Sequence, residues 1–219
     1  MIIENLTFIL EVIGTAAFAV SGVQTALNKR MDIFGTLVLS LVTAVGGGIL
    51  RDLILGDTPP VAFREPVFSF TALLVSAAIF TVAYFRGKKS ESSFENFSRL
   101  INVIDSMGLA IFAIDGVNRA HACGFGENAY LSVFVGMLTA VGGGVIRDIM
   151  AGEIPVILKK RIYALAAFLG CLVYQIIIEH SFTSESTALI ISILLIFVVR
   201  ILATIFRWNL PKLGTNADK

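Results

Sequence analysis

The sequence predicts an all-α membrane protein with seven transmembrane helices, and two observations lead to this prediction: an apolar composition and an internal repeat. Hydrophobic residues make up 56% of the 219 residues and charged residues only 15%, with a mean hydropathy of +0.86. Charged residues account for about a quarter of an average globular domain. We therefore expect the lipid bilayer to be the main solvent of this chain.

Seven stretches are expected to cross the bilayer. A helix needs about 20 apolar residues to cross about 30 Å of hydrocarbon, and five uncharged stretches approach this length: 12–28, 33–50, 66–85, 128–146 and 162–178. Two further spans are weaker, because 101–120 contains Asp105, Asp115 and Arg119 and 186–206 contains Arg200. The first stretch has no basic residue before Lys29, so we expect it to be retained as a span and not cleaved as a signal peptide.

An internal repeat relates these spans. The sequence TAVGGGILRDLILGD at 43–57 returns as TAVGGGVIRDIMAGE at 139–153, and EVIGTAAFAVSGV at 11–23 returns as DSMGLAIFAIDGV at 105–117. A third apolar stretch follows in each copy. We expect one three-helix unit at 1–90, a second at 91–182, and a seventh helix with a tail at 183–219 that braces the pair or contacts another subunit.

The two units are expected to be inverted relative to each other. Three crossings are an odd number, so the second unit enters the bilayer from the opposite side, as in inverted-repeat membrane proteins. Lys and Arg concentrate in cytoplasmic loops. With the N-terminus outside and the C-terminus in the cytoplasm, the cytoplasmic side receives most Lys and Arg residues and the outer side only Arg51, Arg64 and Arg119. This pattern predicts a multi-pass protein of a bacterial or archaeal inner membrane.

Glycine triplets interrupt the second and fifth spans: Gly46, Gly47 and Gly48, and Gly142, Gly143 and Gly144. Each glycine costs about 1 kcal/mol of helix propensity relative to alanine, so we expect a break or kink at each triplet. Unwound backbone would present carbonyl oxygens to a watery cavity, an arrangement that suits dehydrated cations. The alternative interpretation is close helix packing.

An arginine and an aspartate follow each triplet, namely Arg51 with Asp52 and Arg147 with Asp148. Adjacent residues do not share one helix face, so we expect Arg51 and Asp52 to have different partners. We also expect each arginine to hold an acid of the other repeat at the mouth of a polar path, which it can gate. The alternative is that both pairs lie at the interface and pair locally.

Further acidic residues fall within the repeated helices. Asp115 lies inside the fourth span, where an ionisable residue is usually functional, and its counterpart in the first copy is Ser21. Arg119, four residues later, offers a helical ion pair as the structural alternative. Glu11 and Asp105 are matched acids nearer the interfaces, where a solvated charge needs no function. Taken together, the acids outnumber the arginines, which predicts a polar lumen that prefers cations.

Other functional classes are disfavoured. A net charge of +1 without a long basic tract predicts no nucleic-acid partner. The two cysteines and two histidines do not form a metal or catalytic cluster, so we expect neither an enzyme nor a cofactor. Membrane lipid and transiently bound cations are the expected ligands. Arg200 is expected to snorkel or to pair with a neighbouring helix, and His121 to lie in a loop.

The doubled pattern GGG-x-x-RD-x-x-x-G-[DE]-x-P, with three plus three plus one helices, resembles the bacterial members of the trimeric intracellular cation channel (TRIC) family over about residues 1–207. The resemblance implies a homotrimer with a potassium and sodium pore in every subunit. It places both glycine triplets at kinks in the pore wall, with the two Arg-Asp pairs nearby. The lysine-containing motif of the animal members has no counterpart here, so animal-type gating is not expected.

The same duplicated domain is associated with glycine transport in bacteria. A secondary transporter of a small amino acid such as glycine is therefore the alternative, and inverted repeats with broken helices are also the architecture of such transporters. Six repeat helices in about 200 residues leave little material for two rocking bundles. The sequence therefore favours a channel.

Overall fold

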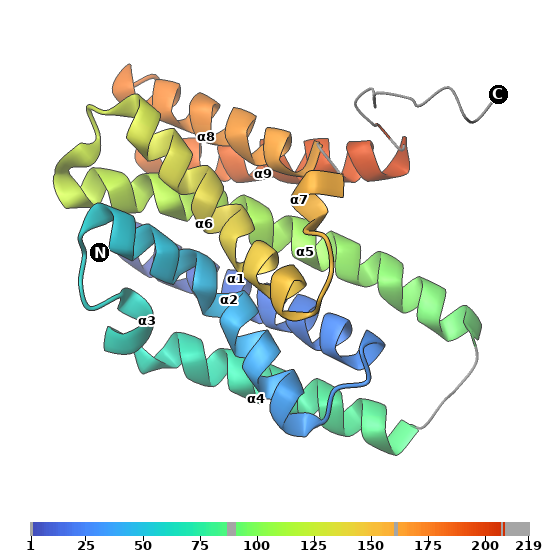
Figure 1. Cartoon of the computed structure of the whole chain (residues 1–219). Coiled ribbons are helices and arrows are strands. Elements are labelled where there is room, and N and C mark those ends of the chain that lie inside the picture. The colour runs from blue at the N-terminus through green and yellow to red at the C-terminus, as the bar shows by residue number, and fades with distance from the viewer. Residues whose placement is uncertain (1, 87–90, 160–161, 207, 209–219) are drawn as a thin grey trace.

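The computed structural model describes residues 2–86, 91–159, 162–206 and 208, and in this part of the chain all regular structure is helical (Figure 1). Seven helices are long and apolar enough to cross a membrane. They are α1 (Ile2–Asn28), α2 (Ile33–Leu55), α4 (Pro66–Arg86), α5 (Glu91–Ala120), α6 (Ala129–Met150), α8 (Ile162–Glu179) and α9 (Glu185–Ile205). Two short helices, α3 (Val61–Arg64) and α7 (Val156–Lys159), follow α2 and α6, and a π-helical turn, His121–Phe125, follows α5.

The matched helices of the two copies run in opposite directions. Figure 1 shows this for α1 and α5, for α2 and α6, and for α4 and α8. These directions are the ones that an inverted repeat requires. The insertion of the two copies from opposite sides of a membrane stays a prediction, as do the boundaries at residues 90 and 182.

The ends of α2 and α6 are built in the same way in both copies. Gly56 ends α2 at φ 72° and Gly152 follows α6 at φ 67°, a left-handed conformation that glycine adopts without a steric cost. The amide of Asp57 then donates to the carbonyl of Asp52 at 2.9 Å, and the amide of Glu153 donates to that of Asp148 at 2.8 Å. The glycine of the repeated motif therefore serves to end the helix and to turn the chain back toward the preceding Arg-Asp pair.

The glycine triplets do not break their helices. Residues 46–48 and 142–144 lie within continuous α-helix, so the predicted break and the unwound carbonyls are wrong. The reason is that α2 and α6 pack against each other here: a methyl group on Gly47 would overlap the carbonyl oxygen of Thr139, and one on Gly143 would overlap that of Thr43. Close packing offsets the low helix propensity of glycine. A kink without loss of helical structure stays a prediction.

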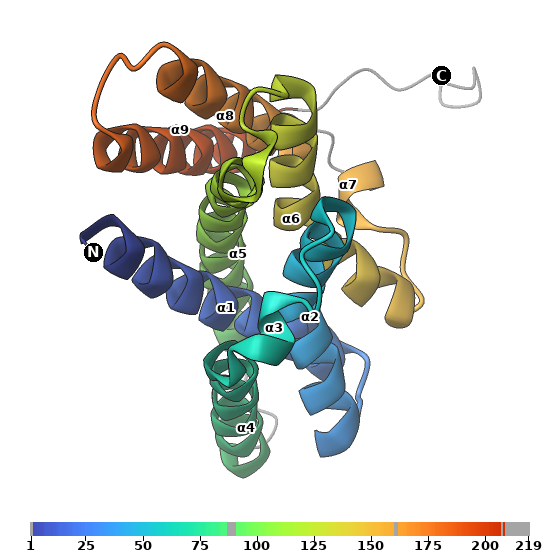
Figure 2. The same cartoon turned by 90° about the vertical axis from the view of Figure 1, so that its left-hand side faces the viewer.

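Helix α5 lies at the centre of the bundle (Figure 2). In its membrane-length segment 67% of the residues are buried, against 17% for α4, which exposes Phe70, Leu74, Tyr84 and Phe85. The unmatched helix α9 packs against α5 and α8, so it braces the second copy within the chain. Four helices from both copies, α1, α2, α5 and α6, surround the buried charges described next.

Candidate functional site

Four ionisable residues from α1, α2 and α5 form a group that we call the Arg51 cluster: Glu11, Arg51, Asp52 and Asp115. Nε of Arg51 donates to Oδ1 of Asp52 at 2.7 Å, and Nη1 donates to Oδ2 of Asp115. Asp52 also accepts the amide of Val61 at 2.7 Å, which ties α3 back to α2. Arg51, Asp52 and Asp115 are all buried, and each is paired with a charge of the opposite sign, as buried ions require.

A cavity of about 40 Å³ opens beside the Arg51 cluster. All four residues of the cluster line it, together with Gly48 of the first triplet and the apolar ring of Phe112. Since a buried water needs at least roughly 10 to 15 Å³, the space is sufficient for a few waters or for one ion with part of its hydration shell. The cavity therefore places a volume large enough for water next to three carboxyl groups.

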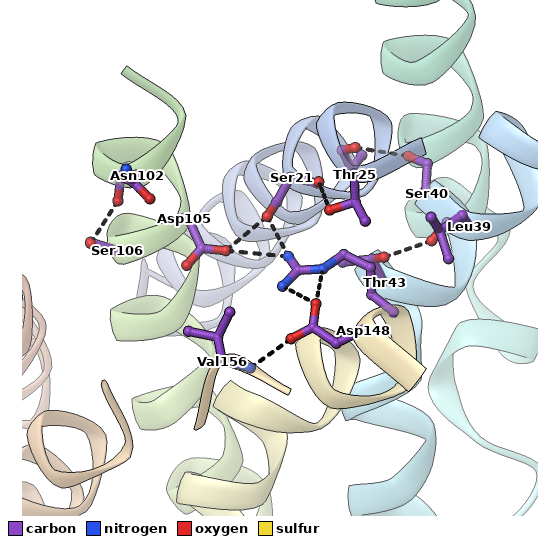
Figure 3. A network of polar contacts seen from close by, with 12 residues as sticks. Ser21, Thr25, Leu39, Ser40, Thr43, Asn102, Asp105, Ser106, Asp148 and Val156 are labelled. Carbon is purple, nitrogen blue, oxygen red and sulfur yellow. Dashed lines mark hydrogen bonds and ion pairs between the residues drawn. The ribbon is translucent and has the colours of Figure 1, made fainter. Parts of the chain in front are cut away.

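A second group, the Arg147 cluster, consists of Ser21, Asp105, Arg147 and Asp148. Figure 3 shows Ser21, Asp105 and Asp148 facing one another from three different helices. Arg147 donates from Nε to Asp148 at 2.9 Å and from Nη1 to the hydroxyl of Ser21 at 2.5 Å. The Ser21 hydroxyl in turn donates to Asp105 at 2.9 Å, so it bridges Arg147 and Asp105. Asp148 accepts the amide of Val156 of α7 at 2.8 Å.

The two clusters are equivalent under the internal repeat. Arg51 and Arg147 occupy matched positions, and so do Asp115 and Ser21. Each arginine therefore contacts the same position of the other copy, a carboxylate in one case and a hydroxyl in the other. Glu11 and Asp105 are likewise matched, and each belongs to the cluster formed around its own copy's arginine. The expected contact between an arginine and an acid of the other repeat is present for Arg51 but not for Arg147, which reaches the Ser21 hydroxyl of the other repeat and pairs with acids of its own.

One pairing expectation is wrong, and so is one of the structural alternatives. Arg51 and Asp52 contact each other, as do Arg147 and Asp148, because the long arginine side chain curls back to the neighbouring carboxylate while still reaching a second helix. The helical pair between Asp115 and Arg119 is not formed: Asp115 accepts from Arg51, and Arg119 donates to Asp57. Asp115 is therefore a member of an interhelical network and not one half of a local helical pair.

Asp57 is a functional candidate that the sequence analysis did not select, although it stands in the repeated motif. It accepts from Arg119 of α5 and, at 2.7 Å, from Arg64 of α3. Partial burial raises the pKa of Asp57, but the hydrogen bonds from the two arginines outweigh this and hold it below its ordinary value of 3.8. The carboxylate after α2 thus links the end of this helix in one copy to a helix of the other.

Glu153, the counterpart of Asp57, has a simpler environment. It accepts from Lys29, at the end of α1, at 3.0 Å, and this hydrogen bond lowers its pKa below 4.5. The carboxylate of Glu153 is 44% exposed and that of Asp57 only 17%. The two copies therefore repeat the position of this acid, but not its degree of burial.

Arg200 of α9 pairs with its neighbours and does not snorkel. Its Nη2 atom lies 3.9 Å from Oδ2 of Asp105, and its guanidinium carbon lies 4.3 Å from the ring centre of Tyr163. Tyr163 was missed in the sequence, where an isolated tyrosine carries no signal of such a contact. His121 was expected in a loop but lies in the π-helical turn after α5, with Nε2 2.7 Å from Oε1 of the buried Gln175.

Chemically, the arrangement can attract and hold a small cation. Carboxylate oxygens suit hard monovalent and divalent cations, and buried charges act through a lower dielectric than water. Among the residues that the structure describes, no group of three potential ligands is arranged as a metal site. An ion at these clusters would therefore be attracted by charge without being held in a fixed ligand cage.

Comparison with known proteins agrees with this fold. A family model described as "Glycine transporter" matches residues 8–84 and 102–179, once in each copy of the repeat. The UPF0126 inner membrane protein YadS of Escherichia coli K12 is 37% identical over 97% of this chain and 97% of its own length.

Solved structures are also similar. One from work on conductance through TRIC cation channels has a TM-score of 0.83 and 41% identity, and the match covers 95% of this chain and 98% of the other. The TRIC trimeric intracellular cation channel orthologue from Rhodobacter sphaeroides has a TM-score of 0.82 and 33% identity, covering 93% of this chain and 99% of its own.

Proposed function

The chain belongs to the TRIC family of bacterial membrane proteins, and we propose that it conducts monovalent cations, potassium and sodium, through a pore inside each subunit of a homotrimer. Seven apolar helices make it a multi-pass membrane protein. The solved relatives are described as cation channels and not as enzymes. The Rhodobacter sphaeroides orthologue is described as trimeric, which supports a trimer here.

The observation that carries the proposal is the pair of buried charged clusters among the four repeat helices. Ionisable residues in membrane-spanning helices are costly and usually mark an ion or substrate path. In the Arg51 cluster three carboxyl groups face one arginine and border a cavity. An excess of carboxylates over arginines favours cations over anions on electrostatic grounds.

The continuous glycine helices change the expected ion ligands. Because residues 46–48 and 142–144 are helical, their carbonyls are used within the helix and are not free to replace a hydration shell. We therefore propose that carboxylates and water, and not bare carbonyls, stabilise the permeant ion. The proposed path follows α1, α2, α5 and α6 from the Arg51 cluster, past the α2–α6 contact, to the Arg147 cluster.

We further propose that the protein lies in the bacterial inner membrane with its N-terminus outside and its C-terminus in the cytoplasm. The basic residues support this orientation, since the loops assigned to the cytoplasm carry most of them. An inner-membrane relative in Escherichia coli supports the location. Labelling of single cysteines introduced at Phe182 and Glu127, which are exposed residues at the ends of helices, would test the topology in intact cells.

Recording from the purified protein in a planar bilayer tests the function. We expect unitary currents whose reversal potential in a KCl gradient approaches the potassium equilibrium potential. Currents that reverse near the chloride potential contradict cation selectivity, and protein-free membranes provide the background. If each subunit of a trimer has its own pore, one trimer should show up to three equal conductance levels.

Glycine transport is the second candidate, because the matching family model carries that description. Proteoliposomes loaded with buffer and given a proton or sodium gradient should then accumulate radiolabelled glycine. Uptake that depends on the gradient, in preparations that show no unitary current, would contradict the channel. Unitary currents that are unaffected by glycine would contradict the transporter.

A further inference from the structure

We infer that Arg200 of α9 is a specificity-determining residue that neutralises the Arg147 cluster and leaves the Arg51 cluster as the stronger cation-attracting region. This inference rests on the proposed channel function. It assigns a role to the seventh helix, which has no counterpart in the repeat. The observations behind it are the position of Arg200, the residues that face it, and the unequal charge of the two clusters.

Arg200 is held inside the protein at the Arg147 cluster. The residue is 6% exposed, although it belongs to an apolar helix that has lipid-facing side chains on its other side. It approaches Asp105 at 3.9 Å and stacks over the Tyr163 ring at 4.3 Å. A guanidinium over an aromatic face is attracted by the ring, and more strongly when it is removed from water. Its Nε atom has no hydrogen-bond partner among the described residues.

The charge of the Arg147 cluster depends on this residue. Without Arg200, two carboxylates, Asp105 and Asp148, face Arg147 alone. With Arg200, two carboxylates face two arginines. Asp105 is the link, since it lies 3.8 Å from Arg147 Nη1 and 3.9 Å from Arg200 Nη2.

The Arg51 cluster has no equivalent of Arg200. Three carboxyl groups, those of Glu11, Asp52 and Asp115, share Arg51. Arg119 is the nearest further arginine on α5, but it is paired with Asp57 beyond the end of α2. With or without a charge on Glu11, the carboxylates of Asp52 and Asp115 outnumber Arg51, so this cluster is negative, whereas two carboxylates and two arginines balance in the Arg147 cluster.

This difference has a consequence for permeation that a purely structural arginine would not have. A fixed charge a few ångström from an ion path changes the local ion concentration, and the effect weakens as salt shortens the Debye length from about 10 Å at 0.1 M to about 3 Å at 1 M. Arg200 should lower the cation concentration near the Arg147 cluster most strongly at low salt. Its removal should make that end of the path attract cations.

Arg200→Gln with Arg200→Lys as its matched control tests the inference in planar bilayers. We expect Arg200→Gln to raise the single-channel potassium conductance at 0.1 M KCl by about two- to fivefold, and to do so by less at 1 M. Reversal potentials in a KCl gradient should move toward the potassium potential, and the current should become more asymmetric with voltage. Arg200→Lys, which keeps the charge, should behave like the parent.

Asp105→Asn provides an independent second variant. It leaves Arg200 without its carboxylate, so the potassium conductance should fall at low salt, and the double variant Asp105→Asn with Arg200→Gln should return toward the parent value. Each variant is compared only after it elutes as a single species with the parent's size. If the parent conducts and Arg200→Gln has the same conductance and reversal potential, the inference is overturned. It is also overturned if Arg200→Lys changes these quantities as much as Arg200→Gln does. A silent parent protein would overturn the proposed function and this inference with it.

Discussion

The Arg51 and Arg147 clusters occupy equivalent positions in the two repeats but differ in charge. Both place an arginine after a glycine triplet, pair it with the following aspartate, and direct it to the same position of the other copy. That position is Asp115 in one cluster and Ser21 in the other, and only the second cluster receives an additional arginine, Arg200. The comparison shows that the repeat preserves geometry, while charge is set by the residues that the repeat does not preserve.

The glycine triplets show the opposite behaviour. They are identical in sequence and equivalent in structure, since the middle glycine of each faces a threonine carbonyl of the other copy. A symmetric contact between two helices leaves no freedom to vary one side alone, because both backbones approach the same point. Function-bearing differences are therefore found at the ends of the α2–α6 contact and not at its centre.

Removal of Arg51 or Arg147 should have the largest effect on stability and should distinguish the two clusters. Arg51→Gln leaves three carboxyl groups without a cation, and we expect a loss of about 3 to 5 kcal/mol in the free energy of unfolding. Arg147→Gln should cost less, because Arg200 still faces Asp105. Reversible unfolding in mixed micelles measures both changes.

The lysine variants Arg51→Lys and Arg147→Lys are the matched controls. Each keeps the charge but loses part of the forked hydrogen bonding, so each should lie between its glutamine variant and the parent. An Arg147→Gln variant that is as destabilised as Arg51→Gln would show that Arg200 does not compensate for the lost charge.

Alanine at the middle glycines should have the next largest effect. Gly47→Ala and Gly143→Ala each introduce a methyl group where a carbonyl of the other helix lies, so we expect a loss of about 1 to 3 kcal/mol in stability. The two losses should be similar, since the contact is symmetric. Thermal denaturation of the detergent-solubilised protein measures them.

The third glycine of each triplet provides the control. A methyl group at Gly48 would lie 3.8 Å from Nη2 of Arg51, and one at Gly144 would lie 3.7 Å from Nη2 of Arg147, both ordinary contacts. Gly48→Ala and Gly144→Ala should therefore be neutral or stabilising, because alanine has the higher helix propensity. A destabilised Gly48→Ala variant with a stable Gly47→Ala variant would contradict the packing role.

Substitutions at Asp115 and Ser21, which occupy matched positions but differ in charge, should alter permeation more than stability. Asp115→Asn removes one carboxylate from the Arg51 cluster, so potassium conductance at 0.1 M KCl should fall by about two- to fivefold. Ser21→Asp adds one to the Arg147 cluster and should raise it. Single-channel recording measures both, with Glu127→Gln, an exposed carboxylate outside both clusters, as control. Unchanged currents in Asp115→Asn would limit that residue to a structural role.

The smallest effect is expected at the acids that follow α2 and α6. Both have a lowered pKa in the folded protein, so each stabilises the protein above its ordinary pKa, and this contribution is lost as the pH falls through the lower folded pKa. At pH 7, Asp57→Asn should cost more than Glu153→Gln, and each should cost less than about 1 kcal/mol. The difference from the parent should shrink as the pH falls below the ordinary pKa of each carboxyl group and vanish below its lower folded pKa, where the carboxyl group of the parent is protonated. Denaturation across pH 3 to 7 measures this, and an increasing difference toward acid would contradict the ion pairs.

Several parts of the site could be predicted because they depend on sequence position alone. Hydropathy located the seven helices, and the repeat identified Arg51, Asp52, Arg147 and Asp148 as candidates. The contact of Arg51 with an acid of the other copy also followed from the burial of opposite charges in a membrane, whereas the contact of Arg147 with the Ser21 hydroxyl did not. Asp57 and Glu153 also stand in the repeated motif, after Gly56 and Gly152, so the repeat could have identified them as candidates.

The remaining features depend on how helices lie against one another. Helix propensity predicted a break at the glycine triplets, but it is a property of an isolated helix, and the contact between α2 and α6 reverses its outcome. The spacing of Asp115 and Arg119 allowed a helical pair, yet closer partners on α2 and after it hold both side chains.

Composition and the internal repeat are thus enough to establish a seven-helix membrane protein with two related halves, because hydropathy and self-similarity can be measured along the chain. Only the tertiary structure shows that the glycines join two unbroken helices, that Arg51 and Arg147 each lie in a four-residue cluster, and that Arg200 of the unmatched helix joins one of them. The physical reason is that an ion pair or a close backbone contact depends on the distance between residues far apart in the chain, and packing sets that distance.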